Sequence, residues 1–136
     1  MTAIDSNVLI GLWNPDDSLN QEAERALEAA MERGALVIAA PVYVELRAVP
    51  GRGEAVIDSF LARTGIVVDW RLEEPIWREA ARANNEYVAR RRKNFKLPRR
   101  IAADFVIGAH AMRRGYPLLT FDKRTFRSTF PDLILA

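Results

Sequence analysis

Four acidic side chains occupy positions where a carboxylate is either costly or well placed to bind a ligand. Asp5 directly follows an aliphatic run, and Asp122 lies shortly after another one. Glu45 and Asp104 fall inside the apolar stripes of two helical patterns, where an ionised carboxylate costs several kcal/mol unless a cation or hydrogen-bond donors meet it. An ion pair with an arginine could neutralise Glu45 or Asp104 taken alone. One shared site, however, accounts for the positions of all four acids together.

Clustered carboxylates either take up protons or bind a divalent cation, because two like charges about 4 Å apart repel by about 4 kcal/mol at an effective dielectric constant of roughly 20. The chain has no cysteine and a single histidine, His110, which excludes thiolate metal sites, cysteine nucleophiles and two-histidine metal sites. Oxygen-only donor sets favour Mg²⁺ or Mn²⁺. These ions lower the pKa of a bound water and stabilise charge on a phosphoryl oxygen, so the acids indicate phosphodiester hydrolysis.

The charges of the chain are segregated, although the net charge is only +2. Residues 90–100 read RRRKNFKLPRR, a run with seven basic and no acidic side chains, whereas residues 16–32 hold six acids and one base. A basic run beside an acidic metal site is suited to hold a nucleic-acid backbone. The alternative is a solvated helix end, since cations are favoured near helix C-termini. The candidates for phosphate contact are Arg92, Lys96, Arg99 and Arg100.

Short aliphatic runs alternate with longer helical patterns, and together they must position these side chains. Strands are predicted at Thr2–Ile4, Leu36–Ala39, Ile66–Val68, Pro117–Thr120 and Leu133–Leu135. Helices are predicted at Ser6–Trp13, Ser18–Arg33, Pro41–Val49, Gly53–Arg63, Glu74–Asn94 and Ile101–Arg114, with a short turn near Thr125. Strands separated by helices predict a three-layer α/β fold, with a mainly parallel central sheet of four to five strands flanked by helices. Ligands of such sheets bind beyond the carboxyl ends of the strands.

The length and composition predict one globular domain spanning residues 1–136. The 136 residues contain no internal repeat or flexible linker. A hydrophobic fraction of 49% and a charged fraction of 28% are ordinary for globular proteins and exclude global disorder. No apolar stretch approaches the roughly 20 residues of a membrane span, and no signal-peptide pattern precedes the first strand. We therefore expect a cytoplasmic protein with no membrane partner.

Four sequence blocks resemble the PIN domain, and specifically the toxin nucleases of VapBC toxin–antitoxin systems. They read AIDSNVLIGLW at residues 3–13, APVYVELRAV at 40–49, AADFVIGAHAMRRG at 102–115 and PLLTFDKRTF at 117–126. The acids also follow the order of the family's quartet. The resemblance implies a PIN-like fold in which Asp5, Glu45, Asp104 and Asp122 are catalytic and line a Mg²⁺ or Mn²⁺ site.

The resemblance further implies the toxin of a type II toxin–antitoxin module, an endoribonuclease that cuts RNA with metal-activated water. Its partners would be the RNA substrate, a cognate VapB-like antitoxin and a second copy of the chain in a homodimer. Ser6, Asn7 and Thr120 match small polar positions that would orient ligands or substrate. Lys123 stands where family members often carry a small polar or acidic residue, which leaves open whether Asp122 is a direct ligand.

Two other functions stay open from the sequence alone. A non-catalytic PIN-like RNA-binding protein would use the basic run, while the acids would serve stability. A phosphoacceptor domain of the receiver type would use Asp69 at a strand end, but it would also need a second acid beside Asp5 and a late Lys-Pro pair, both missing here. We expect Asp69 to be a cap or turn residue, and His110 to be either a surface residue or one satisfied by structural partners rather than a base.

Overall fold

The protein folds around a four-stranded parallel sheet, seen in a computed structural model that describes residues 1–97, 100 and 102–136. The strands are β1 (Thr2–Ile4), β2 (Leu36–Ala39), β3 (Val67–Asp69) and β4 (Leu118–Leu119), in the spatial order β3-β2-β1-β4. All neighbouring strands are parallel. The predicted α/β fold with a mainly parallel sheet is therefore confirmed.

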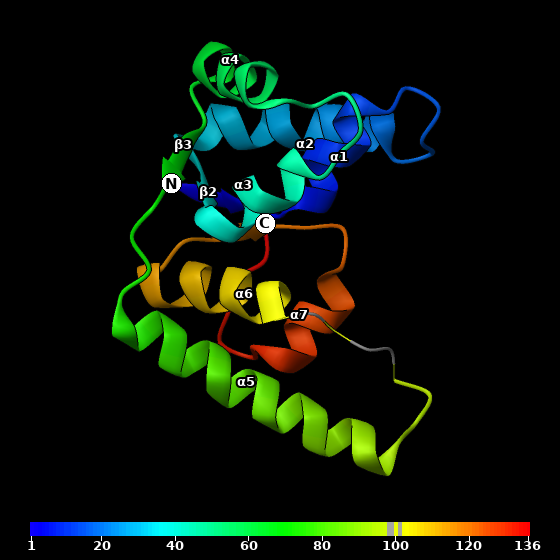
Figure 1. The fold of residues 1–136 in the computed structure, drawn as a ribbon, viewed down its shortest axis with the longest axis vertical. Coiled ribbons are helices and arrows are strands. Elements are labelled where there is room, and N and C mark those ends of the chain that lie inside the picture. Colours follow the sequence, from blue (N-terminus) through cyan, green and yellow to red (C-terminus); the bar gives the residue numbers. More distant parts are fainter. Residues whose placement is uncertain (98–99, 101) are drawn as a thin grey trace.

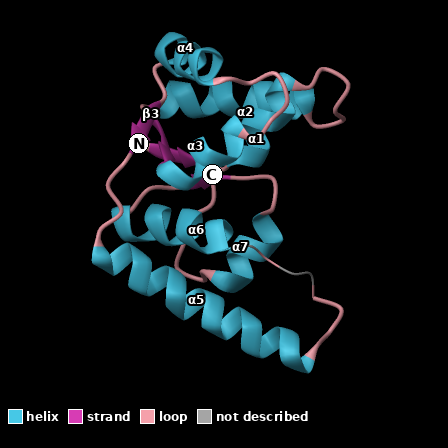
Figure 2. Ribbon diagram, in the orientation of Figure 1, coloured by secondary structure: helices cyan, strands magenta, loops and turns pink. Residues whose placement is uncertain are grey.

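Seven helices in the described residues flank this sheet. They are α1 (Ser6–Trp13), α2 (Asn20–Arg33), α3 (Ala40–Arg47), α4 (Glu54–Thr64), α5 (Glu74–Lys93), α6 (Ala102–Arg114) and α7 (Lys123–Thr129). Figure 1 and Figure 2 show α1, α2 and α4 in one half of the molecule and α5, α6 and α7 in the other, with α5 lying along α6. None of the helices in this described part is long and apolar enough to cross a membrane.

The strands form where aliphatic side chains are covered on both faces of the sheet. Every residue of β1, β2 and β4 is buried, which is typical of parallel strands between helix layers. Ile4 and Ile38 are fully buried in the same core. Parallel neighbours need long crossover connections, and the helices supply them. β3 lies at one edge of the sheet, and its Val67 is accordingly exposed.

The fifth predicted strand, Leu133–Leu135, is reduced to a single parallel bridge between Leu135 and Leu118. The Leu118 N–H donates to the carbonyl of Ile134 at 2.8 Å, and the Ala136 N–H donates to the carbonyl of Leu118 at 2.9 Å. Alternate residues of a parallel strand turn their backbone groups to opposite neighbours. Because β4 has only two residues, Leu118 alone faces this segment, and the sheet has the lower of the two predicted strand numbers.

β1, β2 and α1 have the predicted bounds, and the short turn predicted near Thr125 is the helix α7. The other element bounds differ from the predicted ones by one or two residues. β3 begins and ends one residue later than predicted, so Asp69 is its last residue. α3 begins at Ala40 and ends at Arg47, before the predicted end at Val49. The predicted start of the late helix, Ile101, lies outside the described residues, and α6 is described from Ala102. These small shifts leave the order of the elements as predicted.

The topology gathers the candidate acids at one edge of the sheet. β1 and β4 are parallel neighbours, so Asp5 and Asp122 both follow carboxyl ends of adjacent strands. α3 follows β2 directly and carries Glu45, while α6 packs against α3 and carries Asp104 in its first turn. The fold therefore brings four segments, far apart in the sequence, to the location where open α/β sheets bind ligands.

Candidate active site

Asp5 is the most buried of the four candidate acids, with 4% of its surface exposed. It stands at the N-cap of α1, but its side chain makes no capping hydrogen bond. Its Oδ2 atom accepts a hydrogen bond of 2.8 Å from Oγ1 of Thr120, a fully buried residue. The carboxylate therefore faces β4 and its following loop rather than the end of its own helix.

Thr120 links the ends of β1 and β4 through one hydroxyl group. Besides donating to Asp5, its Oγ1 accepts the backbone N–H of Asp122 at 3.0 Å and Nδ2 of Asn7 at 3.4 Å. The Oδ1 atom of Asn7 in turn accepts the backbone N–H of Phe121 at 3.2 Å. Two residues singled out from the sequence as orienting groups, Asn7 and Thr120, thus hold the loop that carries Asp122 against the start of α1.

Glu45 reaches the same region from α3. Ser6, the third residue singled out as an orienting group, donates its hydroxyl to Oε2 of Glu45 at 3.2 Å. The other carboxylate oxygen, Oε1, is buried and accepts no hydrogen bond from the residues that the structure describes. A buried carboxylate oxygen without a donor is costly. Glu45 is therefore held in place on one side and has an unsatisfied oxygen on the other.

The pKa of Asp5 is raised from its ordinary value of 3.8 to about 6. Burial is the largest cause, because it disfavours the charged form. The negative charges of Asp104 and Asp122 raise the pKa further, while the hydrogen bonds from Thr120 and from the backbone of Ser6 lower it. The charges of two other candidate acids thus act directly on Asp5.

Glu45 belongs to the same electrostatic group. Burial raises the pKa of its carboxyl group above the usual value, and the charges of Asp5 and Asp104 add to this rise. The hydrogen bond from Ser6 opposes them. Asp5, Glu45 and Asp104 therefore repel one another, which is the relationship expected of acids that share one site.

Asp122 forms an ion pair in the described part of the chain. Its Oδ2 atom lies 2.6 Å from Nη1 of Arg100, and Nη2 of Arg100 donates to Oγ1 of Thr125. Asp122, Arg100 and Asp104 also line one small pocket. Arg100, predicted to contact phosphate, instead neutralises the last acid of the quartet in this structure. Among the described residues, neither Asp5 nor Glu45 forms such an ion pair.

The donor set fits a hard divalent cation, but the side chains do not form a finished metal site. Carboxylate oxygens are the ligands that Mg²⁺ and Mn²⁺ prefer, and the buried Oε1 of Glu45 accepts no hydrogen bond from the described residues and so could bind an ion. The described residues include no group of three or more His, Cys, Asp or Glu side chains that could hold a metal ion as they stand.

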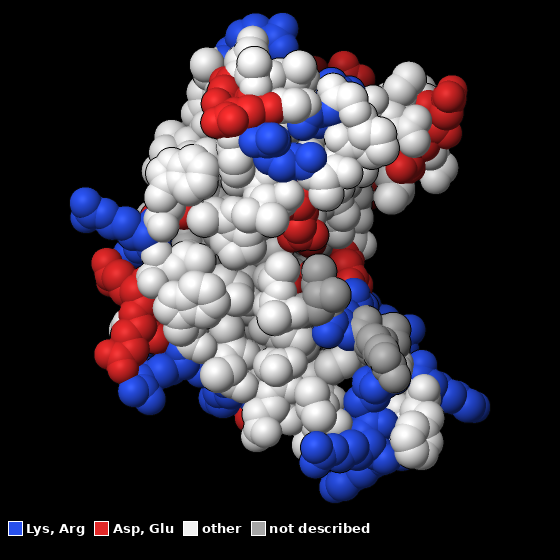
Figure 3. All heavy atoms as spheres, in the orientation of Figure 1, with Lys and Arg blue, Asp and Glu red and all other residues white. Residues whose placement is uncertain are grey.

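The basic run forms the end of α5 and the turn after it. Arg92 and Lys96 are exposed there, whereas Arg99 lies outside the described residues. Figure 3 shows Lys and Arg atoms gathered over this end of α5, with acidic surface immediately above them on the same side of the molecule. The segregation of charge seen in the sequence is thus also a segregation in space, with the basic surface next to the acidic one.

A family model described as the PIN domain matches residues 2–129 of the chain. The chain belongs to the PIN domain family. The match covers the four candidate acids and all seven helices of the described residues. No curated protein matches this PIN domain in sequence.

Solved structures with the same fold include toxin–antitoxin complexes. A toxin–antitoxin complex from Klebsiella pneumoniae has a TM-score of 0.64 and 21% identity, over 98% of this PIN domain and 96% of that chain. FitAcB from Neisseria gonorrhoeae has a TM-score of 0.66 and 20% identity, over 99% and 96%. VapBC2 from Rickettsia felis, bound to a DNA fragment from its promoter, has 0.62 and 19%, over 99% and 96%. At these identities the similarity establishes the fold.

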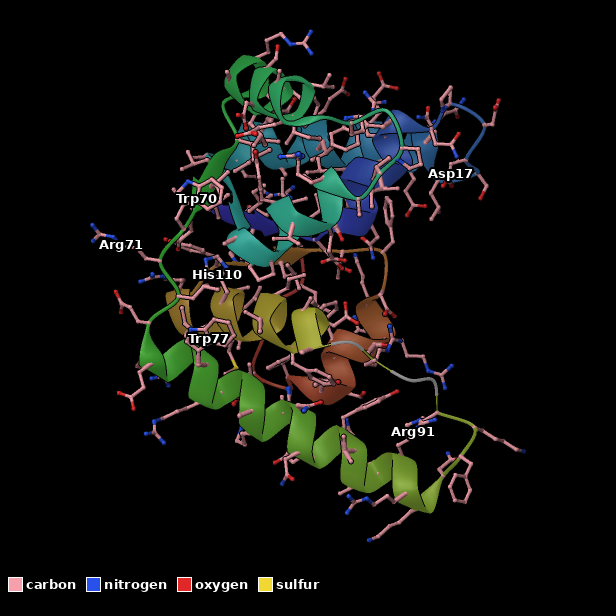
Figure 4. The ribbon with its side chains drawn as sticks, in the orientation of Figure 1. Asp17, Trp70, Arg71, Trp77, Arg91 and His110 are labelled. Atoms are coloured by element: carbon pink, nitrogen blue, oxygen red, sulfur yellow. The ribbon has the colours of Figure 1, made fainter. Side chains whose placement is uncertain are left out.

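A second polar cluster in the PIN domain ties α6 to β3. Nε2 of His110 lies 2.9 Å from Oδ2 of Asp69, and Nε of Arg114 donates to the same oxygen at 3.2 Å. Burial alone would raise the pKa of Asp69, but the hydrogen bond from His110 and the charge of Arg114 hold it below the usual value. His110 is buried and satisfied, as expected, and Figure 4 places it on α6. The partnership of these residues gave no signal in the sequence, because 41 residues separate His110 from Asp69.

Proposed function

We propose that this PIN domain is a Mg²⁺- or Mn²⁺-dependent endoribonuclease that acts as the toxin of a type II toxin–antitoxin module. The observation that carries the proposal is the buried, unsatisfied Oε1 of Glu45 near the buried carboxylate of Asp5 at the carboxyl edge of the sheet, where the charge of Asp104 also raises the pKa of both groups. Burial of Asp5 and of the unsatisfied Glu45 oxygen costs the fold stability, whereas a divalent cation between these groups would turn this cost into binding energy. Such a site beside a basic surface is suited to a phosphodiester substrate.

The proposed ligands are Asp5, Glu45 and Asp104, with Asp122 as a fourth once Arg100 releases it. A bound ion would supply an activated water and stabilise negative charge on the phosphate. No side chain is needed as a covalent nucleophile, so the expected products carry a 5′-phosphate and a 3′-hydroxyl. The oxygen of Glu45 that accepts no hydrogen bond from the described residues supports its role as a ligand.

Hydroxyl and amide groups of the chain would hold the acids in position. Ser6 donates to one oxygen of Glu45, and Thr120 donates to one oxygen of Asp5. Asn7 fixes the loop after β4 through the backbone of Phe121. Such hydrogen bonds limit the rotation of the carboxylates and so reduce the reorganisation needed when an ion binds.

The proposed protein partners are a cognate antitoxin and a second copy of the chain. One structure with this fold is named as a toxin–antitoxin complex and another as VapBC2, which supports an antitoxin partner. Trp70 and Val44 are 63% and 69% exposed, and aromatic residues such as Trp70 are enriched at interfaces relative to the rest of a protein surface. In a homodimer these side chains would be covered. The proposed setting is the cytoplasm, where RNA and antitoxin both occur.

The test is an RNA cleavage assay with the purified protein. Incubation with labelled RNA and Mn²⁺ should yield fragments with 5′-phosphate ends, and EDTA should stop the reaction. Asp104→Asn should remove cleavage while circular dichroism shows an intact fold. Cleavage at the unmodified rate by Asp104→Asn, or in the presence of EDTA, would contradict the proposed roles.

A non-catalytic RNA-binding function is the second candidate. It is favoured by the ion pair between Arg100 and Asp122, which occupies one acid of the quartet, and by the lack of a finished metal site in the described residues. In that case RNA binding should survive EDTA and no fragments should appear with Mn²⁺. A phosphoacceptor function is not proposed, because Asp69 is held by His110 and Arg114.

A further inference from the structure

A groove with basic walls runs between the C-terminal end of α5 and α7. It has a volume of about 640 Å³ and is lined in part by Lys96, Arg100 and Arg124. Asp122 also lines it, so the groove opens directly onto the candidate active site. Lys96 and Arg124 along one groove are suited to contact phosphates of a nucleic-acid strand, and Arg100 could join them only after leaving Asp122.

The walls of this groove are fixed by contacts within the chain. The guanidinium group of Arg90 lies 5.6 Å from the centre of the Tyr87 ring and donates to the carbonyl of Ser128 on α7 at 3.3 Å. Arg91, labelled in Figure 4 at this end of α5, donates to the carbonyl of Leu97 at 3.3 Å. The end of α5 is therefore tied both to α7 and to the turn that follows it.

Phe95 projects from that turn without a packing role. The backbone N–H of Lys96 donates to Oδ1 of Asn94 at 3.1 Å, so the turn is closed by its polar residues. Phe95 is 86% exposed, more than any other large apolar side chain that the structure describes. Single exposed apolar residues are common on protein surfaces. This ring differs in its position, because both of its neighbours in the chain line the basic groove.

We propose that Phe95 is a base-stacking residue for an unpaired RNA strand whose phosphates lie along the basic groove. This inference rests on the proposed function, because it assigns the route by which RNA reaches Asp122. Proteins that hold single strands combine a cationic groove for the backbone with aromatic rings on which bases stack. The observed arrangement contains both features, in adjacent residues.

The proposal specifies the form of RNA that binds. A base can stack on a side chain only when its face is free, and bases in a duplex are already stacked on their neighbours. The groove should therefore favour an unstructured strand or a loop over a duplex of the same sequence. The salt-dependent part of the affinity should come from Lys96 and the arginines, and the strand preference should come from Phe95.

The experiment measures binding of a labelled, unstructured oligoribonucleotide by fluorescence anisotropy in EDTA, so that binding is read without hydrolysis. Phe95→Ala should weaken binding by roughly tenfold or more, the range seen when a stacking ring is removed. Phe95→Trp should restore it, because the larger ring also stacks. The affinity for the matching duplex should hardly change in either variant. Trp77→Leu is the control, since it removes an exposed ring at the opposite end of α5.

The dependence of the affinity on salt separates stacking from charge. Lys96→Ala should lower the slope of log affinity against log salt by about 0.7, the value for one phosphate contact on a single strand. Phe95→Ala should leave this slope unchanged, because the ring carries no charge. An equal loss of affinity for the single strand and the duplex would overturn the stacking role, as would a Phe95→Ala variant that binds both like the unmodified protein.

Two further outcomes distinguish this inference from its alternatives. A Phe95→Ala variant with unchanged RNA affinity but a smaller mass in sedimentation would assign the ring to contact between copies, and would overturn the inference. A protein that binds unpaired RNA through Phe95 but yields no fragments with Mn²⁺ would contradict the proposed nuclease while leaving the inference intact. A Phe95→Ala variant that binds and cleaves unpaired RNA like the unmodified protein would support the proposed nuclease and overturn the inference.

Discussion

The hydroxyl of Thr120 donates a hydrogen bond of 2.8 Å to the carboxylate of Asp5, although 115 residues separate them in the chain. Both residues are buried, and each follows a strand of the same parallel pair. The same hydroxyl accepts the backbone N–H of Asp122. One side chain therefore sets the relative position of two acids of the candidate site.

Thr120→Val should destabilise the protein, because it keeps the shape of the side chain but removes its hydroxyl. The carboxylate of Asp5 loses a donor, and the N–H of Asp122 loses an acceptor. We expect the free energy of unfolding, measured with urea, to fall by about 1–3 kcal/mol. Thr120→Ser keeps the hydroxyl and serves as the control. A valine variant as stable as the serine variant would show that the link has no energetic importance.

Asp5→Asn should stabilise the protein above pH 6 in the absence of metal. The pKa of Asp5 is raised in the folded state, so the folded protein binds the proton more tightly and loses stability as the pH rises from about 4 to about 6. Asparagine carries no charge and escapes this loss. The stability advantage of the variant over the unmodified protein should grow across that pH range, by up to about 3 kcal/mol, and stay level above it.

The same pair of proteins reports on ion binding. Added Mn²⁺ should stabilise the unmodified protein more than Asp5→Asn, because a ligand that binds only the folded state raises its stability. Thermal melts at pH 7.5 with EDTA and with Mn²⁺ give this comparison directly. An advantage of Asp5→Asn that does not vary with pH would contradict the raised pKa. An equal response of both proteins to Mn²⁺ would contradict the role of Asp5 as a ligand.

Arg100→Gln should increase the affinity of the RNA-free protein for Mn²⁺. The substitution removes the guanidinium that pairs with Asp122 at 2.6 Å, and so frees that carboxylate for the ion. We expect isothermal titration calorimetry to give a severalfold lower dissociation constant for Mn²⁺. Arg124→Gln removes another positive charge from the same groove and is the matched control. Equal affinities in the two variants would mean that Asp122 does not reach the ion.

Gly108→Ala should destabilise the fold at a position outside the candidate site. A Cβ atom at Gly108 would overlap the ring of Phe130, which is almost fully buried and has no room to move. Overpacking of this kind costs about 1–3 kcal/mol. At Gly11, also in a helix, the nearest atom to an added Cβ belongs to Phe121 at an ordinary 3.5 Å. Gly11→Ala should therefore keep or raise the melting temperature, and a similar loss in both variants would contradict this packing account.

Local patterns in the sequence were sufficient to select the acids and the order of the elements. Glu45 and Asp104 lie in apolar stripes, so their charges had to be met by a cation or by hydrogen-bond donors. The alternation of strands and helices predicted a parallel sheet. The proximity of these acids follows from that topology. The charge of Asp104, which raises the pKa of both Asp5 and Glu45, agrees with it, while ligation of an ion stays a prediction.

Contacts between distant segments could not be read from the sequence. In the sequence, Arg100 was one of several arginines in a basic run. Its ion pair with Asp122 depends on how α7 places Thr125 beside its guanidinium group. The pairing of His110 with Asp69 likewise depends on how the fold brings α6 to the end of β3. The reduction of the fifth strand to one bridge depends on the length of β4, which the aliphatic pattern overestimated by two residues.

The most direct test of the central claim is the location of Mn²⁺ in crystals of the protein by anomalous scattering. The account predicts one strong peak bounded by carboxylate oxygens of Asp5, Glu45 and Asp104, with Oε1 of Glu45 among the ligands. A peak elsewhere, or none at this edge of the sheet when Mn²⁺ is saturating, would contradict the account.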